Sequence, residues 1–154
     1  DVAPDADSEG KVYRVNPTGN VPKGTIIDLT LYGGQVEMPA PAAPTFQGAP
    51  QNVAPNGPLT LMWNGYSCPS GTGAVSAYEF SIQNGTITGG NTFGQNARTA
   101  PVVAADAPGQ SVVVTYTVTC SGGTGGTRTT GASGELSIPI QAAPAPDPTD
   151  GGDE

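Results

Sequence analysis

The 154-residue sequence contains no histidine. Histidine is the most common general base, a frequent zinc ligand and the side chain that titrates nearest to neutral pH. Its absence argues against a hydrolase with a Ser-His-Asp triad, an ordinary zinc centre and a histidine pH switch. The two lysines, Lys11 and Lys23, lie in no catalytic motif. We therefore predict that the chain is not an enzyme and has no catalytic residues, no metal ligands and no cofactor.

Basic residues are also scarce, with 5 Lys and Arg against 13 Asp and Glu and a formal net charge of −8. No basic cluster is available to neutralise phosphates, so nucleic acid is not an expected partner. Eight acidic residues lie in the segments 1–9 and 147–154, which leaves 13 − 8 = 5 acids against 5 bases between them. We predict solvated acidic tails over 1–9 and 142–154, the second one disordered. A calcium-binding tail is the alternative, but the regular D-x-D-x-D-G spacing is missing.

Long apolar runs are missing too. No run reaches the roughly 18 residues that a membrane span needs, and we expect no signal peptide within these residues. We expect that the chain does not itself span a membrane. If the native protein is extracellular, we expect an export signal or a membrane anchor upstream of Asp1.

Glycine and proline, in contrast, are abundant: 23 + 16 = 39 residues, about a quarter of the chain. Both residues disfavour helix interiors, and the apolar residues come in short runs that alternate with polar ones, as in strands. The alternating sets are Leu59, Leu61 and Trp63; Tyr78, Phe80 and Ile82; Val112, Val114, Tyr116, Val118 and Cys120; and Leu136, Ile138 and Ile140. This pattern predicts an all-β fold, with a β-sandwich over residues 46–141.

The dipeptide Asn84-Gly85 follows the second alternating run directly, and Thr86-Ile87-Thr88 comes next. Asn-Gly is the strongest short signal for a hairpin, because a type I′ turn needs positive φ at both central residues. The pattern therefore predicts a tight hairpin between 78–83 and 86–88.

The only two cysteines are Cys68 and Cys120. A cysteine pair in a strand-rich chain predicts one disulfide and an oxidising compartment; two buried free thiols are the alternative. Cys120 shares a face with Tyr116 and Val118, so it is expected to point into the core. A bridge would close a loop of about 52 residues and stabilise the fold by roughly 4 kcal/mol on the chain-entropy model.

The larger unit resembles a fibronectin type III domain. The matching residues are Trp63 in LTLMWNG, Tyr78 in AYEFSI and the run APGQSVVVTYTVT that leads to Tyr116. In immunoglobulin domains the tryptophan follows the first cysteine, whereas here Trp63 precedes Cys68. A disulfide is not typical of the type III fold, so an immunoglobulin-like variant remains an alternative.

Residues 10–34, GKVYRVNPTGNVPKGTIIDLTLYGG, resemble the second half of a PASTA module. That resemblance implies a first strand over Val12 to Val15, a turn at Pro17 and Gly19, and an entry to the last strand at Gly24-Thr25. We predict a partial PASTA hairpin over 10–36. A Pro/Ala linker, 37–45, would then separate this hairpin from the sandwich.

PASTA modules occur in the extracellular part of bacterial membrane Ser/Thr protein kinases and are associated with peptidoglycan. The resemblance implies a non-catalytic sensor or binding region, membrane-tethered in the native protein, that contacts peptidoglycan fragments or cell-envelope proteins. The chain is expected to lie on the extracellular face of a bacterial cell membrane, or to be secreted. The chain lacks the kinase motifs, so any kinase activity would lie elsewhere. The alternative function is a structural or adhesive spacer of a secreted or cell-surface protein.

Aromatic side chains are the candidate ligand contacts, because they can stack on sugar rings; the candidates are Tyr13, Tyr32, Tyr66 and Phe93. Packing beneath loops is the alternative for Tyr66 and Phe93. A glycosidase would need two paired carboxylates, for which Glu79 and Glu135 are the candidates in the sandwich. Both are expected to be solvated surface acids.

Overall fold

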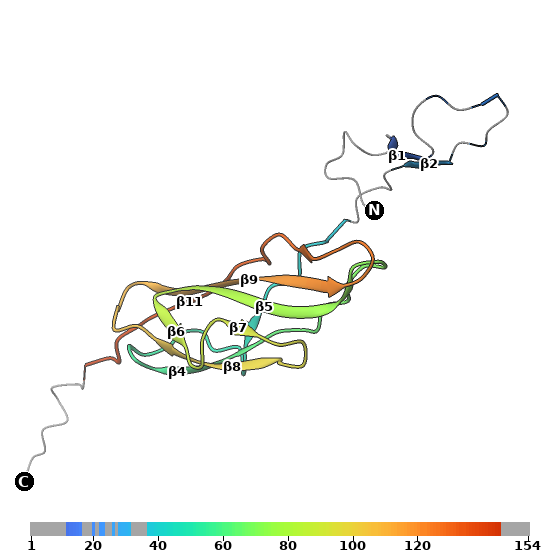
Figure 1. The fold of residues 1–154 in the computed structure, drawn as a ribbon. Coiled ribbons are helices and arrows are strands. Elements are labelled where there is room, and N and C mark those ends of the chain that lie inside the picture. Colours follow the sequence, from blue (N-terminus) through green and yellow to red (C-terminus); the bar gives the residue numbers. More distant parts are fainter. Residues whose placement is uncertain are drawn as a thin grey trace, which may run out of the picture.

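The computed structural model describes residues 12–16, 20, 22, 23, 26, 28–31 and 37–145. All regular structure in these residues is β, and two antiparallel sheets pack face to face (Figure 1), which confirms the predicted β-sandwich. A separate two-stranded hairpin lies outside the sandwich. The described part of the chain contains no helix long and apolar enough to cross a membrane.

The sandwich consists of a long sheet and a short sheet. The strands of the long sheet are β5 (Gly73–Gln83), β7 (Thr92–Phe93), β9 (Ser111–Gly122), β10 (Arg128–Thr129) and β11 (Leu136–Pro139). Their order is β10-β9-β5-β7, and β11 also pairs with β9. The strands of the short sheet are β3 (Thr45–Phe46), β4 (Pro58–Met62), β6 (Gly85–Ile87) and β8 (Thr99–Ala104), in the order β3-β4-β8-β6.

Strand β9 shows why the alternating sequence folds in this way. Every second residue from Val112 to Cys120 is buried, and the intervening ones are partly exposed. Successive strand residues point to opposite faces, so this pattern places one complete face of β9 in the core. Strand β5 pairs with β9 from Gly73–Gly122 to Gln83–Val113 and brings Tyr78 and Phe80 to the same face.

The core lies between the two sheets and includes the residues that the alternation predicts. Its buried members are Phe46, Val53, Leu61, Trp63, Tyr78, Phe80, Ile87, Ala100, Val102, Ala104, Val112, Val114, Tyr116, Val118, Ile138 and Ile140. Pro44 is fully buried and stands immediately before β3. The proline-rich approach to the sandwich therefore packs against it at this residue.

The predicted hairpin at Asn84-Gly85 is wrong. Of the two predicted turn residues, Asn84 has positive φ (54°) and Gly85 does not, and β6 pairs with β8 of the short sheet instead of folding back on β5. Two contacts hold this crossing: Asn84 Nδ2 donates to the Ser111 carbonyl (2.8 Å), and the Ala105 N–H donates to the Asn84 carbonyl (2.9 Å). The passage of the chain from β5 in the long sheet to β6 in the short sheet buries Ile87 beside Val102. Core packing at Ile87 therefore outweighs the local preference of Asn-Gly for a hairpin turn.

The chain enters the sandwich at one end and leaves at the other (Figure 1). At the entry end the hydroxyl of Tyr66 donates to the carbonyl of Pro39 (2.8 Å). At the exit end β11 runs along the first residues of β9, and the Ile140 N–H donates to the Gln110 carbonyl (2.8 Å). The long strands lie along the line between these two ends.

In the hairpin outside the sandwich, β1 (Val12–Asn16) pairs antiparallel with β2 (Asp28–Leu31). The partial PASTA hairpin over 10–36 stays a prediction, because the pairing of two short strands does not identify a family. The predicted turn residues Pro17, Gly19, Gly24 and Thr25 lie outside the described residues, as do the tail 1–9 and residues 146–154 of the C-terminal tail.

Candidate functional site

The predicted disulfide is present. Cys68, in the loop between β4 and β5, is bonded to Cys120 on β9, and their Cα atoms lie 5.9 Å apart. Cys120 is fully buried, as expected from its face of the strand. The loop that contains Cys68 follows β4 of the short sheet, and the disulfide links this loop to β9 in the long sheet. The link lies at the end of the sandwich where the chain enters.

Backbone packing fixes the loop beside the disulfide. Gly73 has a φ of 93°, and a Cβ at this position would overlap the carbonyl of Ser121. Only glycine fits both the dihedral and the close approach. Thr72 is buried and its hydroxyl donates to the Pro69 carbonyl (2.7 Å), while the Gly125 N–H donates to the Gly71 carbonyl (2.8 Å). The loop is therefore held at several points.

A groove of about 300 Å³ lies against this loop. We call it the Arg98 groove; its lining residues are Tyr66, Cys68, Gly73, Ala74, Val75, Tyr78, Gln95, Asn96 and Arg98. They come from the disulfide loop, from β5 and from the loop before β8. Its size is at the lower end of the range for small-ligand sites.

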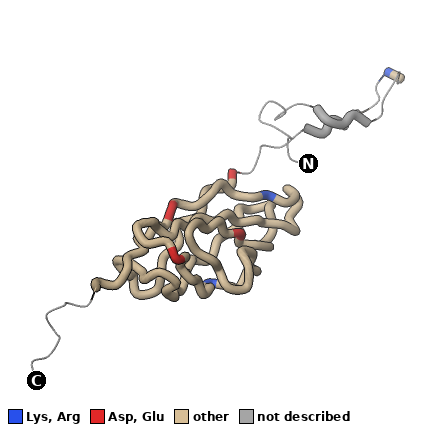
Figure 2. The backbone as a smooth tube through the Cα atoms, turned by 90° about the vertical axis from the view of Figure 1, so that its left-hand side faces the viewer, with Lys and Arg blue, Asp and Glu red and all other residues tan. Residues whose placement is uncertain are grey.

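Arg98 carries the only charge in this groove. Its Nη1 donates to the carbonyls of Gln95 (2.7 Å) and Ala97 (2.6 Å), and its guanidinium carbon lies 5.5 Å from the centre of the Tyr78 ring. Charged residues are few along the backbone of the sandwich (Figure 2). A fixed cation beside amides and an aromatic ring is suited to hold an anionic or strongly polar group.

Tyr66 and Tyr78 form the aromatic part of the groove. The Tyr66 N–H donates to the Tyr78 hydroxyl (3.0 Å), and the Tyr66 hydroxyl donates to the Pro39 carbonyl. Burial raises the pKa of the Tyr66 phenol above its ordinary value of 10.0. Tyr66 was predicted as a ligand contact, and the structure places it, partly exposed, in the lining.

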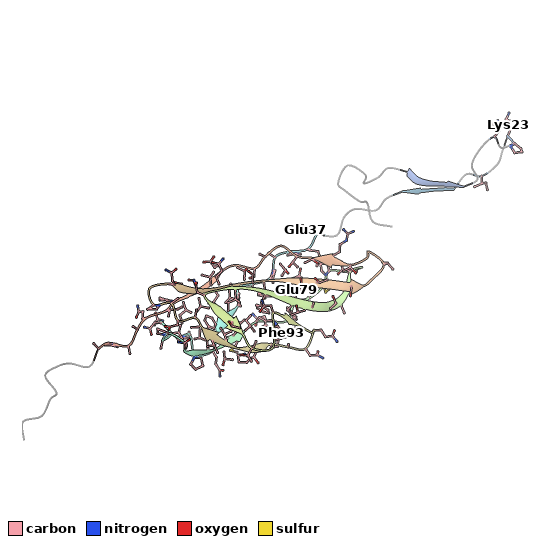
Figure 3. All side chains as sticks on the ribbon, turned by 60° about the vertical axis from the view of Figure 1, so that its left-hand side comes forward. Lys23, Glu37, Glu79 and Phe93 are labelled. Atoms are coloured by element: carbon pink, nitrogen blue, oxygen red, sulfur yellow. A yellow bond between two sulfur atoms is a disulfide. The ribbon has the colours of Figure 1, made fainter. Side chains whose placement is uncertain are left out.

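Phe93, the other predicted contact from the sandwich, is labelled in Figure 3, and it packs in an aromatic cluster. Its ring centre lies 5.3 Å from that of Trp63 and 5.8 Å from that of Phe80. Phe93 remains partly exposed, but it does not line the Arg98 groove. The structure therefore does not bring Phe93 and Tyr66 into one site.

Trp63 is buried at the centre of the cluster, and its Nε1–H has no hydrogen-bond partner among the described residues. The indole nitrogen can only donate, so this group gives up a bond to water without replacing it. The packing of its ring against Tyr78, Phe80 and Phe93 offsets that cost.

The remaining sequence candidates lie elsewhere. Tyr32 is outside the described residues, and of Tyr13 only the backbone, in β1, is described. Glu79 is exposed on β5 (Figure 3), and Glu135 is exposed just before β11. Within the described ranges no three His, Cys, Asp or Glu residues gather as a metal site.

Two larger hollows, of about 510 and 440 Å³, flank the loop between β3 and β4. Neither is lined by a charged side chain, and both share Pro50. They offer apolar and amide surface without a group that would orient a ligand. The Arg98 groove is the better candidate site for this reason.

No family model, curated protein or solved structure matches the chain. Two packed antiparallel sheets occur in many unrelated families, so architecture alone does not select one of them. Assignment to the PASTA or the fibronectin type III family therefore stays a prediction from the residues quoted above.

Proposed function

We propose that this chain is a non-catalytic ectodomain region of a bacterial PASTA-type membrane Ser/Thr protein kinase, and that it contacts peptidoglycan fragments or other cell-envelope material. The region lies on the extracellular face of the membrane. The pairing of β1 with β2 at the positions given by the PASTA resemblance supports this assignment. The disulfide between Cys68 and Cys120 is compatible with an oxidising compartment.

The observation that carries the binding function is the Arg98 groove. It combines a fixed guanidinium, two exposed side-chain amides and two tyrosines in one polar concavity. Fragments of a cell wall made of sugar and peptide present carboxylates, amides and hydroxyls, which these groups can bind. A polar groove of this size supports weak recognition of a small fragment.

The test is a titration of the isotopically labelled chain with soluble muropeptides, followed by amide chemical shifts. We expect saturable shifts with a dissociation constant near the millimolar range. No shift in any residue at 10 mM muropeptide, roughly tenfold above that constant, contradicts direct binding by this region.

A spacer is the second candidate function, and one observation favours it. The chain enters the sandwich at the disulfide end and leaves at the opposite end, so the domain separates whatever flanks it (Figure 1). This function predicts an elongated particle in small-angle scattering and no partner in a pull-down from cell envelopes. A reproducible partner that binds the sandwich contradicts a purely structural role.

A further inference from the structure

We propose that the Arg98 groove binds the free carboxylate of a short peptide, through the Nε and Nη2 edge of Arg98. The ligand class is a peptide of a few residues with an unblocked C-terminus, and the choice of a cell-wall peptide rests on the proposed function. The carboxylate recognition itself rests on the contacts of Arg98, which are argued below.

Arg98 is held in place by hydrogen bonds, but these bonds do not use all of its donors. A guanidinium has five N–H donors, and the two on Nη1 are directed at the carbonyls of Gln95 and Ala97. No hydrogen bond or ion pair within the described residues uses its Nε or Nη2. These two nitrogens form the side edge of the fork, which is a preferred geometry for binding both oxygens of a carboxylate.

The glycine at position 65 keeps this edge open. A Cβ on Gly65 would lie 2.7 Å from Nη2 and 3.3 Å from Nε of Arg98. Any larger residue would therefore press on the guanidinium at the place where a ligand oxygen must approach. Gly65 has no positive φ, so its backbone conformation does not require glycine. The space that glycine leaves beside Nε and Nη2 of Arg98 is a reason for glycine at position 65 that does not depend on the backbone dihedral.

The rest of the lining fits a peptide terminus. The exposed amides of Gln95 and Asn96 can donate to and accept from a peptide bond next to the carboxylate. The ring of Tyr78 lies against the guanidinium and limits the directions in which it can move. No acidic residue lines the groove, so no carboxylate of the lining competes for Arg98.

The probes are N-acetyl-D-alanyl-D-alanine and its C-terminal amide, titrated into the full labelled chain. The readouts are the Nε–H resonance of Arg98 and the backbone amides of 65–68 and 95–98. We expect the acid to shift these signals and to bind at least tenfold more tightly than the amide, because a charge-assisted bidentate bond is lost in the amide. Equal shifts by both probes overturn carboxylate recognition.

Two variants test the role of Arg98. Arg98→Gln is expected to weaken binding of the acid at least tenfold, and the matched control Arg128→Gln, which makes the same change in net charge outside the groove, is expected to leave it within twofold. Gly65→Ala keeps the charge but displaces the guanidinium, and we expect a similar loss. Unchanged binding in Arg98→Gln, or equal losses in Arg98→Gln and Arg128→Gln, overturns the proposal.

The outcomes separate this proposal from the proposed function. If muropeptides shift signals outside the groove and the acid probe shifts none inside it, the groove proposal is wrong and the proposed function stands. If the acid probe binds in the groove but muropeptides do not bind, the carboxylate site stands and the cell-wall function is wrong. If neither ligand shifts any signal, both are wrong.

Discussion

The hydroxyl of Ser133 accepts a hydrogen bond of 3.0 Å from the backbone N–H of Tyr116, in the centre of β9. Two positions along, the hydroxyl of Thr130 accepts from the N–H of Val118, also at 3.0 Å. The backbone N–H groups of Ser133 and Thr130 donate in turn to the carbonyls of Tyr116 and Val118. The segment between β10 and β11 thus completes the edge of β9 with side chains where a neighbouring strand is missing.

We predict that Ser133→Ala destabilises the sandwich by about 1–3 kcal/mol, because a buried backbone N–H loses its acceptor. Urea unfolding followed by tryptophan fluorescence measures this change. Ser137, exposed on β11, is the matched control, and Ser137→Ala is expected to stay within about 0.5 kcal/mol of the parent. Equal effects of the two substitutions contradict the role given to Ser133.

Removal of the disulfide is expected to destabilise the fold by roughly 4 kcal/mol, because the bond closes a loop with a sequence separation of 52 residues. The double variant Cys68→Ala, Cys120→Ala and reduction of the parent chain are compared by urea unfolding with and without dithiothreitol. Dithiothreitol has no effect on the double variant if the disulfide alone accounts for the difference. A reduced parent as stable as the oxidised one contradicts the prediction.

Phe93→Ala is expected to cost about 1–2 kcal/mol, less than a fully buried phenylalanine, because Phe93 is partly exposed. The substitution also changes the surroundings of Trp63, the only tryptophan, so the fluorescence maximum is expected to shift to longer wavelength. Phe93→Leu, which keeps an apolar side chain, is the control and should restore most of the stability. A variant with normal stability and weakened ligand binding would return Phe93 to the predicted role of ligand contact.

Alkaline pH is expected to destabilise the sandwich. Burial, and secondarily the nearby Tyr78, raise the pKa of the Tyr116 phenol above its ordinary value of 10.0. The Tyr116 phenol therefore loses its proton at lower pH in the unfolded chain than in the folded one. The protonated phenol's contribution to folding stability is complete below pH 10 and is lost as the pH rises through the raised pKa. Urea midpoints between pH 8 and 11.5 measure the loss, and Tyr116→Phe should make the decline shallower. An unchanged slope in Tyr116→Phe contradicts this origin.

The central architecture could be predicted from the sequence because the burial of one strand face leaves a period-two pattern. The runs around Leu61, Tyr78, Tyr116 and Ile138 gave the fold class, the core and the inward direction of Cys120. The partner of Cys68 followed, since the chain has only two cysteines. These predictions depend on local periodicity, which a single sequence retains.

The connections and the candidate site could not be predicted in the same way. The turn at Asn84 depends on acceptors and donors from Ser111 and Ala105, which are distant in the sequence. Short strands such as β7 have too few residues to show a period. Arg98 was not singled out, because its role depends on Gly65 and Tyr78. The one available signal was its rarity, as one of two cations between residues 46 and 141.

The disulfide between Cys68 and Cys120, at the end where the chain enters the sandwich, affects how the domain responds to force. If the two ends of the sandwich are pulled apart, the force acts along the strands, so the ladder hydrogen bonds are loaded in shear. Once the sheets separate, the oxidised chain still cannot extend between Cys68 and Cys120, whose separation is 52 residues. At about 3.3 Å per residue, roughly 170 Å of contour length stays locked until the sulfurs are reduced. The redox state of one cysteine pair therefore sets how far the molecule can stretch.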